Sequence, residues 1–430
     1  MKKFRIFLAA GLCLLFSLVF FHGKQETVLE FAMFSGSNWD VEVKDSYLVV
    51  EEAIAKFERE HPGVRVKYVS GIPKEDYSEW LAGRAMLDRM PDVMMVLDRD
   101  FEKLVQLGLL ENLEPYVGRD SDFFLEAYYP ALLKGGCFGS GRYALPYEAM
   151  PYLMFVNKSL LDENHMGMPD RDYTFGDLYY ICRSITRDKD GDGDPDHYGI
   201  YQYSWQDAAL SDGVKLFSDD GKNAYFNQDN LAEAISFVKS LNELHKNQTI
   251  TREMFDQGQV AFMPLSLAEY RTYRSYPYKI KKYTDFSWDC ISMPAGPHGA
   301  SVSMVDSLNI AMGSGSRHKK LAWEFLKTLT YDREIQSLLY HSMPVASVRI
   351  DVMEAPENAQ VLSREQQESI ISSDFISQVI RQGSPKPKFT AYPGAILLAD
   401  SEIAKLYTEE TDMTNGLRMI QRKIQDYLNQ

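Results

Sequence analysis

The sequence predicts an α/β fold built as two lobes, and three observations lead to this prediction. The chain has 430 residues, which is more than one ordinary domain holds. Strand-like and helical segments alternate after the N-terminus, an order typical of a parallel sheet covered by helices. No low-complexity linker interrupts the chain, so we expect lobes joined by strands that cross between them.

The first part of the chain carries the clearest alternation. Residues 28–34 form an apolar strand-like run, and apolar residues then recur at helical spacing over 50–57. Residues 64–69 alternate as a second strand, a helical stretch covers 77–89, and 91–96 form a short buried strand. In such sheets ligands bind beyond the carboxyl ends of the strands.

Later segments continue the mixture of strands and helices. Residues 152–157 are predicted as extended, 231–245 and 321–329 as helices, and 307–312 as a strand. The chain from about residue 350 onward is predicted to be mostly helical. The fold class is therefore α/β throughout.

The charge of the chain narrows the class of partner. The net charge is −15, and neither a run of basic residues nor a glycine-rich phosphate loop is present in the sequence. Nucleic acid needs a basic surface, so it is not an expected partner. A neutral or cationic ligand suits the acidic balance, which also serves solubility.

The first 27 residues have the layout of a secretory signal or membrane anchor. Lys2, Lys3 and Arg5 precede an apolar run over 6–21, and a polar stretch follows. This order places the bulk of the chain outside the cytoplasm, either secreted or anchored to the outer face of the membrane. Cys13 lies in the middle of the apolar run, so lipidation there is disfavoured against cleavage or retention of the segment.

An aspartate-rich loop resembles the first part of a calcium-binding EF-hand loop. Carboxylates stand at positions 1, 3, 5 and 9 of the loop, and a glycine stands at position 6. A structural calcium ion is predicted here, and a solvated acidic loop without an ion is the alternative. The candidate metal-binding residues of the loop are Asp188, Asp190, Asp192, Asp194 and Asp196, with Asp194 at position 7.

Several ordered phrases resemble those of extracellular solute-binding protein family 1, the maltose-binding-protein-like sugar-binding proteins of ABC transporters. The resemblance covers nearly the whole chain after the N-terminal segment. The phrases are AIAKFE at 53–58, PDV at 91–93, GRYALP at 141–146, FVNK at 155–158, FDQGQVAF at 255–262, MPAGP at 293–297 and SLNIAM at 307–312.

This resemblance implies a type II periplasmic-binding-protein fold, with two hinged lobes that close on a ligand between them. The first lobe would comprise 28–146 plus 291–345, and the second 147–290 plus 346–430. The protein would act as a monomer that captures a carbohydrate, most simply an oligosaccharide, and delivers it to the permease subunits of an ABC transporter.

Sugar recognition requires flat aromatic faces and side chains that exchange hydrogen bonds with hydroxyl groups. Such residues stand in loops at the predicted strand ends, near the crossover, and in the second lobe. For Trp39 the alternative is packing, and for Asp98 a helix cap. The candidate ligand-binding residues are Asn38, Trp39, Asp98, Tyr147, Glu148, Tyr203, Trp205, Asp207, Glu269 and Asp306.

No catalytic residue is predicted, and the chain is not expected to be an enzyme. The sequence contains neither a G-x-S-x-G phrase nor an H-E-x-x-H phrase. Two alternatives are weighed. One is a sugar-binding partner of a membrane sensor, and the other is a secreted glycoside hydrolase with paired carboxylates.

Overall fold

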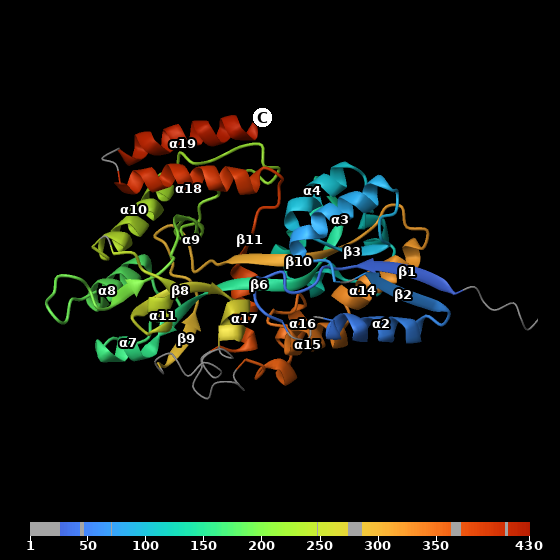
Figure 1. Cartoon of the computed structure of the whole chain (residues 1–430), viewed down its shortest axis with the longest axis horizontal. Helices are drawn as coiled ribbons and strands as arrows, with labels where there is room; N and C mark the ends of the chain where they lie inside the picture. Colours follow the sequence, from blue (N-terminus) through green and yellow to red (C-terminus); the bar gives the residue numbers. More distant parts are fainter. Residues whose placement is uncertain are drawn as a thin grey trace, which may run out of the picture.

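The protein forms two lobes that lie side by side along its long axis (Figure 1). In this computed structural model, the N-terminal signal or anchor predicted over residues 1–27 lies almost wholly outside the described residues. The structure describes residues 26–43, 47–69, 71–246, 248–273, 286–362, 371–408 and 412–430.

The first lobe is built around the predicted parallel strands. Strand β1 (Thr27–Ala32) pairs in parallel with β2 (Val64–Val69) on one side and with β3 (Val93–Val96) on the other. Helix α2 (Leu48–Glu60) buries its predicted apolar stripe, and α3 (Lys74–Met86) follows β2. The predicted strand and helix order of this region is therefore confirmed.

Strand β6 (Ala144–Asn157) belongs to both lobes. Its first half pairs antiparallel with β10 (Met304–Met312), which lies between β3 and β6 in the first lobe. Its second half pairs antiparallel with β8 (Val260–Ser266) and β9 (Trp288–Ile291) in the second lobe. The long strand therefore crosses between the lobes, as Figure 1 shows at the centre of the molecule.

Helices surround the sheet of the second lobe. Strand β7 (Tyr198–Ile200) pairs in parallel with β8 and carries the sheet to its edge. Helices α18 and α19 pack against each other, and α19 also contacts α10 (Figure 1). The helices of this lobe are α7 (Lys158–Glu163), α8 (Phe175–Ile185), α9 (Trp205–Ser211), α10 (Asp229–Glu243), α11 (Arg252–Asp256), α12 (Leu267–Tyr273), α18 (Tyr392–Thr408) and α19 (Met413–Leu428).

The remaining elements are short or belong to the first lobe. They are α4 (Asp98–Gln106), α5 (Glu114–Val117), η1 (Leu125–Ala127), α6 (Pro130–Lys134), β4 (Cys137–Phe138), β5 (Gly141–Arg142), α14 (Lys319–Thr330), α15 (Arg333–Ser342), α16 (Ile350–Met353), η2 (Pro356–Asn358), α17 (Ser373–Gln382) and β11 (Ser384–Pro385).

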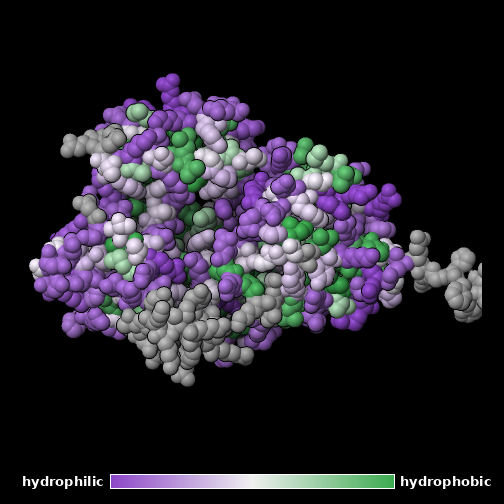
Figure 2. Space-filling view, in the orientation of Figure 1, coloured by the Kyte–Doolittle hydropathy of each residue, from purple (hydrophilic) through white to green (hydrophobic). Residues whose placement is uncertain are grey.

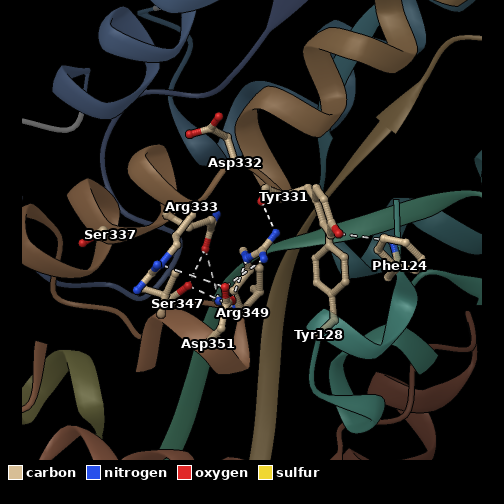
Figure 3. Close-up of polar contacts among 12 residues, drawn as sticks. Phe124, Tyr128, Tyr331, Asp332, Arg333, Ser337, Ser347, Arg349 and Asp351 are labelled. Atoms are coloured by element: carbon tan, nitrogen blue, oxygen red, sulfur yellow. Dashed lines mark hydrogen bonds and ion pairs between the residues drawn. The ribbon is translucent and has the colours of Figure 1, made fainter. Parts of the chain in front are cut away.

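The segment that contains α16 and α17 packs with the first lobe, whereas the sequence prediction assigned all of 346–430 to the second. Arg349 anchors this segment, because its guanidinium lies 4.2 Å from the centre of the Tyr331 ring and donates to both carboxylate oxygens of Asp351, at 2.8 and 3.0 Å (Figure 3). Helix α17 also contacts α6 and β6. Of the helices described after residue 346, α18 and α19 are the ones that lie in the second lobe.

The surface hydropathy, the helix lengths and the burial of the cysteines are those of an ordinary globular protein. The face seen in Figure 2 is mostly hydrophilic, with small apolar patches scattered over both lobes. Across the described ranges, no helix has the length and apolar character needed to span a membrane. Cys182 is a buried free thiol and Cys137 a half-buried one, and the side chain of Cys290 is buried in the core.

Candidate functional site

A cleft of about 320 Å³ lies where the lobes meet. One wall of the cleft belongs to the first lobe and is formed by the loop after β1, the end of β3 and strand β10. The other wall is formed by β6, β8 and the segment that leads from β11 into α18. The polar and aromatic residues of the lining are Asn38, Trp39, Asp40, Lys74, Asp98, Arg99, Tyr152, Ser266, Asp306, Lys386, Lys388, Phe389, Thr390 and Tyr392.

Two lysines and two aspartates form a charged cluster in this cleft. The ammonium of Lys388 lies 2.7 Å from a carboxylate oxygen of Asp98 and 3.6 Å from one of Asp306. That of Lys386 lies 3.1 Å from Asp306 and 3.9 Å from Asp98. Lys388 is further held by the carbonyl of Ser307, which accepts from it at 2.9 Å. The cluster joins the β11–α18 segment to the first lobe.

The two aspartates differ in their electrostatic environment. Burial alone would raise the pKa of Asp306, but the two lysine ammonium groups outweigh it and lower this pKa. Burial raises the pKa of Asp98, with Lys388 opposing and Asp306 adding to the increase. Of the two carboxyl groups, Asp306 therefore takes up a proton less readily than Asp98.

Aromatic side chains from both sides line the same cleft. Trp39 comes from the first lobe, Tyr152 from the crossing strand, and Phe389 and Tyr392 from the β11–α18 segment. Phe389 packs edge-on against Phe217 of the second lobe, with ring centres 5.3 Å apart. The β11–α18 segment therefore contacts both lobes.

Glu148 fixes the indole of Trp39. The indole Nε1 donates to a carboxylate oxygen of Glu148 at 2.7 Å, and only 4 % of Glu148 is exposed. Burial raises the pKa of Glu148 to about 7, although the hydrogen bond from Trp39 acts in the opposite direction. Glu148 thus lies behind the cleft wall and orients one of its aromatic side chains.

Four of the predicted ligand-binding residues line the cleft. They are Asn38, Trp39, Asp98 and Asp306, and Glu148 contacts the cleft through Trp39. Asp98 and Trp39 follow β3 and β1, so the rule that sites lie beyond the carboxyl ends of strands located this wall.

The other five predicted residues lie elsewhere. Tyr147 is 3 % exposed and is buried in the hydrophobic core that includes the strands of the first lobe. Tyr203 and Trp205 are buried in the core of the second lobe. Asp207 caps helix α9, where it accepts from the backbone N–H of Ser204 at 3.0 Å. Glu269 accepts from the backbone N–H of Ser266 at 2.8 Å and so supports a residue of the lining without lining the cleft itself. These five were wrong as direct cleft contacts, because packing and capping occupy them.

The sequence prediction did not include the cationic side of the cleft. Lys386 and Lys388 stand two residues apart in the segment after β11, and the ammonium groups of both reach Asp98 and Asp306. A lysine-proline-lysine phrase of this kind could have been noted in the sequence, but its position beside Asp98 follows only from the tertiary fold. Tyr152 and Phe389 were likewise not predicted, whereas Tyr392, a weaker candidate from the sequence, does line the cleft.

The aspartate-rich loop lies apart from the cleft lining. The carboxylate oxygens of Asp188, Asp190 and Asp196 come within 4.8 Å of one another. Asp188 accepts from the backbone N–H groups of Gly191 at 2.6 Å and Gly193 at 2.8 Å, and these bonds lower its pKa. Three converging ionised carboxylates on a tight loop suit a hard cation such as calcium.

Comparisons with known proteins agree with this architecture. The structure resembles a cyclic α-maltosyl-1,6-maltose binding protein from Arthrobacter globiformis (TM-score 0.78, 15% identity, 94% of this chain and 99% of that chain covered). It also resembles the sugar-binding protein MalE from Xanthomonas citri (TM-score 0.75, 18% identity, 94% and 98% covered). A third neighbour is an ABC substrate-binding protein from Listeria monocytogenes in complex with cycloalternan (TM-score 0.68, 16% identity, 94% and 99% covered).

These neighbours share the two-lobed type II periplasmic-binding-protein fold, which confirms the predicted fold class. The family model for bacterial extracellular solute-binding proteins matches residues 42–333, the stretch that runs from the first lobe through the crossing strands and back. The chain therefore belongs to the bacterial extracellular solute-binding proteins, a family of extracytoplasmic binding proteins that work with ABC transporters.

Proposed function

We propose that this protein captures a carbohydrate, most simply an oligosaccharide, in the cleft between its lobes and delivers it to an ABC transporter permease. One observation carries the proposal. The cleft combines aromatic rings with a paired set of carboxylates and ammonium groups. Sugars present C–H faces for stacking and hydroxyl groups that both donate and accept, so this combination matches them.

The charge balance of the four-residue cluster supports a neutral ligand. Asp98 and Asp306 are each within ion-pair distance of a lysine, so the cluster carries no net charge. Its carboxylates accept from hydroxyl groups, and its ammonium groups donate to hydroxyl and ring oxygens. A ligand that replaces part of these ion pairs must both donate hydrogen bonds to the carboxylates and accept them from the ammonium groups. The hydroxyl groups of a polyol do both.

The names of the structural neighbours favour oligosaccharides. Two of them are associated by name with cyclic glucose oligomers, cycloalternan and cyclic α-maltosyl-1,6-maltose. An oligosaccharide also matches the placement of aromatic rings on both sides of the cleft, since several sugar rings can be stacked at once.

The test is a ligand screen followed by calorimetry on matched tryptophan variants. The full chain is screened by thermal shift against linear and cyclic oligosaccharides, monosaccharides and polyamines. A ligand at 100 times its Kd stabilises by about 2.7 kcal/mol, which raises the melting temperature measurably. The Kd of each hit is then measured for the wild type and for Trp39→Ala and Trp80→Ala.

Trp80 is the control because its ring stacks on Tyr77 within the first lobe, 5.8 Å between centres, away from the cleft lining. We expect Trp39→Ala to weaken sugar binding about tenfold or more, equivalent to about 1.4 kcal/mol, and Trp80→Ala to leave it unchanged. Equal affinities for all three proteins would refute the cleft as the sugar site, and a response to polyamines alone would refute the carbohydrate ligand.

We further propose that the aspartate-rich loop holds a structural calcium ion, with Asp188, Asp190 and Asp196 as the carboxylate ligands. The convergence of these three carboxylates supports the proposal. The ion would stabilise the loop without contacting the sugar.

A further inference from the structure

A second group of metal-ligating side chains lies beside the segment that connects β9 to β10. Asp212 follows the C-terminus of α9, Glu233 lies in the first part of α10, and His298 lies in the connecting segment. His298 Nδ1 is 3.4 Å from Asp212 Oδ2 and 3.6 Å from Glu233 Oε2. The ligand atoms of all three residues lie within 4.8 Å of one another.

The backbone fixes two of these residues against each other. The N–H of His298 donates to Asp212 Oδ1 at 2.7 Å, and the N–H of Gly296 donates to the carbonyl of Ser211 at 3.2 Å. A Cβ at Gly296 would lie 2.5 Å from Asp212 Oδ1, and a Cβ at Gly299 only 2.0 Å from the Ser211 carbonyl. Glycine at both positions therefore allows the connecting segment to approach Asp212 closely.

The electrostatics of the group call for a positive charge. The side chain of Asp212 is completely buried, yet it forms no ion pair with lysine or arginine in the part of the chain that the structure describes. The backbone N–H and the ring of His298 contact its two carboxylate oxygens, and Glu233, another acid, is its other titratable neighbour. A buried carboxylate is costly unless a cation compensates it.

The distances within the group also match the separation of two ligand atoms on one metal ion. His298 Nδ1 forms a long hydrogen bond of 3.4 Å with Asp212 Oδ2 and lies 3.6 Å from Glu233 Oε2. Zinc binds histidine nitrogen and carboxylate oxygen at about 2.0–2.2 Å in tetrahedral geometry, which places two ligand atoms roughly 3.4 Å apart.

We propose that Asp212, Glu233 and His298 bind a zinc ion, with water as the remaining ligand. One imidazole nitrogen and two carboxylate oxygens suit zinc, whereas the all-oxygen aspartate loop suits calcium. The side chains of Glu233 and His298 are about half exposed, at 53 % and 54 %, so the ion can enter from solvent. It would join α9 and α10 to the segment that runs between the lobes.

The experiment measures zinc binding to the full chain after treatment with a chelator, by competition with a chromophoric zinc indicator. His298→Ala removes the nitrogen ligand from an exposed position, and Glu233→Gln removes one carboxylate. Asp190→Asn, in the aspartate-rich loop, is the matched control. We expect zinc to bind the wild type and Asp190→Asn equally, and His298→Ala at least about tenfold more weakly.

Cobalt substitution provides a second readout. Cobalt(II) in the wild type should show the intense visible absorption of a four-coordinate site with a nitrogen ligand, and this absorption should be lost in His298→Ala. The same zinc affinity in His298→Ala and the wild type would overturn the proposal, as would loss of zinc binding in Asp190→Asn alone. Thermal unfolding without metal checks that each variant is folded.

Discussion

Replacement of Glu148 by glutamine should change how the stability of the protein depends on pH. The carboxyl group is buried and its pKa is raised to about 7, because burial disfavours the charged form. Glutamine is close in shape to the protonated side chain, and its carbonyl can still accept the hydrogen bond from Trp39. The variant therefore represents the neutral state at every pH.

The size of the effect follows from the difference in pKa between the folded and unfolded chains. The folded value of about 7 lies above the ordinary value of 4.5. Between these values the folded state binds more protons than the unfolded state, so the stability of the wild type falls as pH rises through this window. A difference of roughly 2.5 pH units corresponds to about 3 kcal/mol, fully lost above the folded pKa.

Urea denaturation of wild type and Glu148→Gln from pH 4 to 9 measures this contribution. Subtraction removes the titration of all other groups, because both proteins share them. We expect the stability of Glu148→Gln relative to the wild type to rise by about 3 kcal/mol from the acidic to the alkaline end. A relative stability that does not change with pH would show that Glu148 has an ordinary pKa and is accessible to water.

Three further variants test other parts of the structure. Trp205→Ala should destabilise the protein by about 3–5 kcal/mol in urea denaturation, because the ring is buried in the second core; a change in sugar affinity without loss of stability would contradict this. Arg349→Lys should lower the unfolding free energy by about 2 kcal/mol through loss of the paired bonds to Asp351, and an unchanged melting temperature would show that the pair contributes nothing. Calcium should raise the melting temperature of the wild type but not of Asp190→Asn, and an equal rise in both would exclude the loop as the site.

The parts of the fold with regular local patterns could be predicted from the sequence. The apolar stripe of α2 and the alternation of β2 each match an observed element. Only residues 152–157 of strand β6 were predicted as extended, since Pro146 and Pro151 interrupt the strand and burial on both faces removes the alternation. Its continuity depends on partners from both lobes, which no local pattern records.

In the candidate site, too, some residues could be placed from local sequence patterns and others only from the tertiary fold. Trp39 and Asp98 follow predicted strands, so strand order alone placed them correctly at the cleft. Trp205 was misassigned because it follows polar residues, although Ser204 and Asp207 form the capping box of a helix that turns the indole into the core. Lys388 comes from the far end of the chain, and only the tertiary fold brings it to Asp98.

The position of β10 has a consequence for the order in which the protein can fold. The strand lies between β3 and β6, so the first lobe lacks a central strand until residue 312 has left the ribosome. Its core is complete only after α17, which ends at Gln382. Contacts between residues so far apart in sequence form slowly. The nascent chain therefore remains without a finished lobe for most of its synthesis.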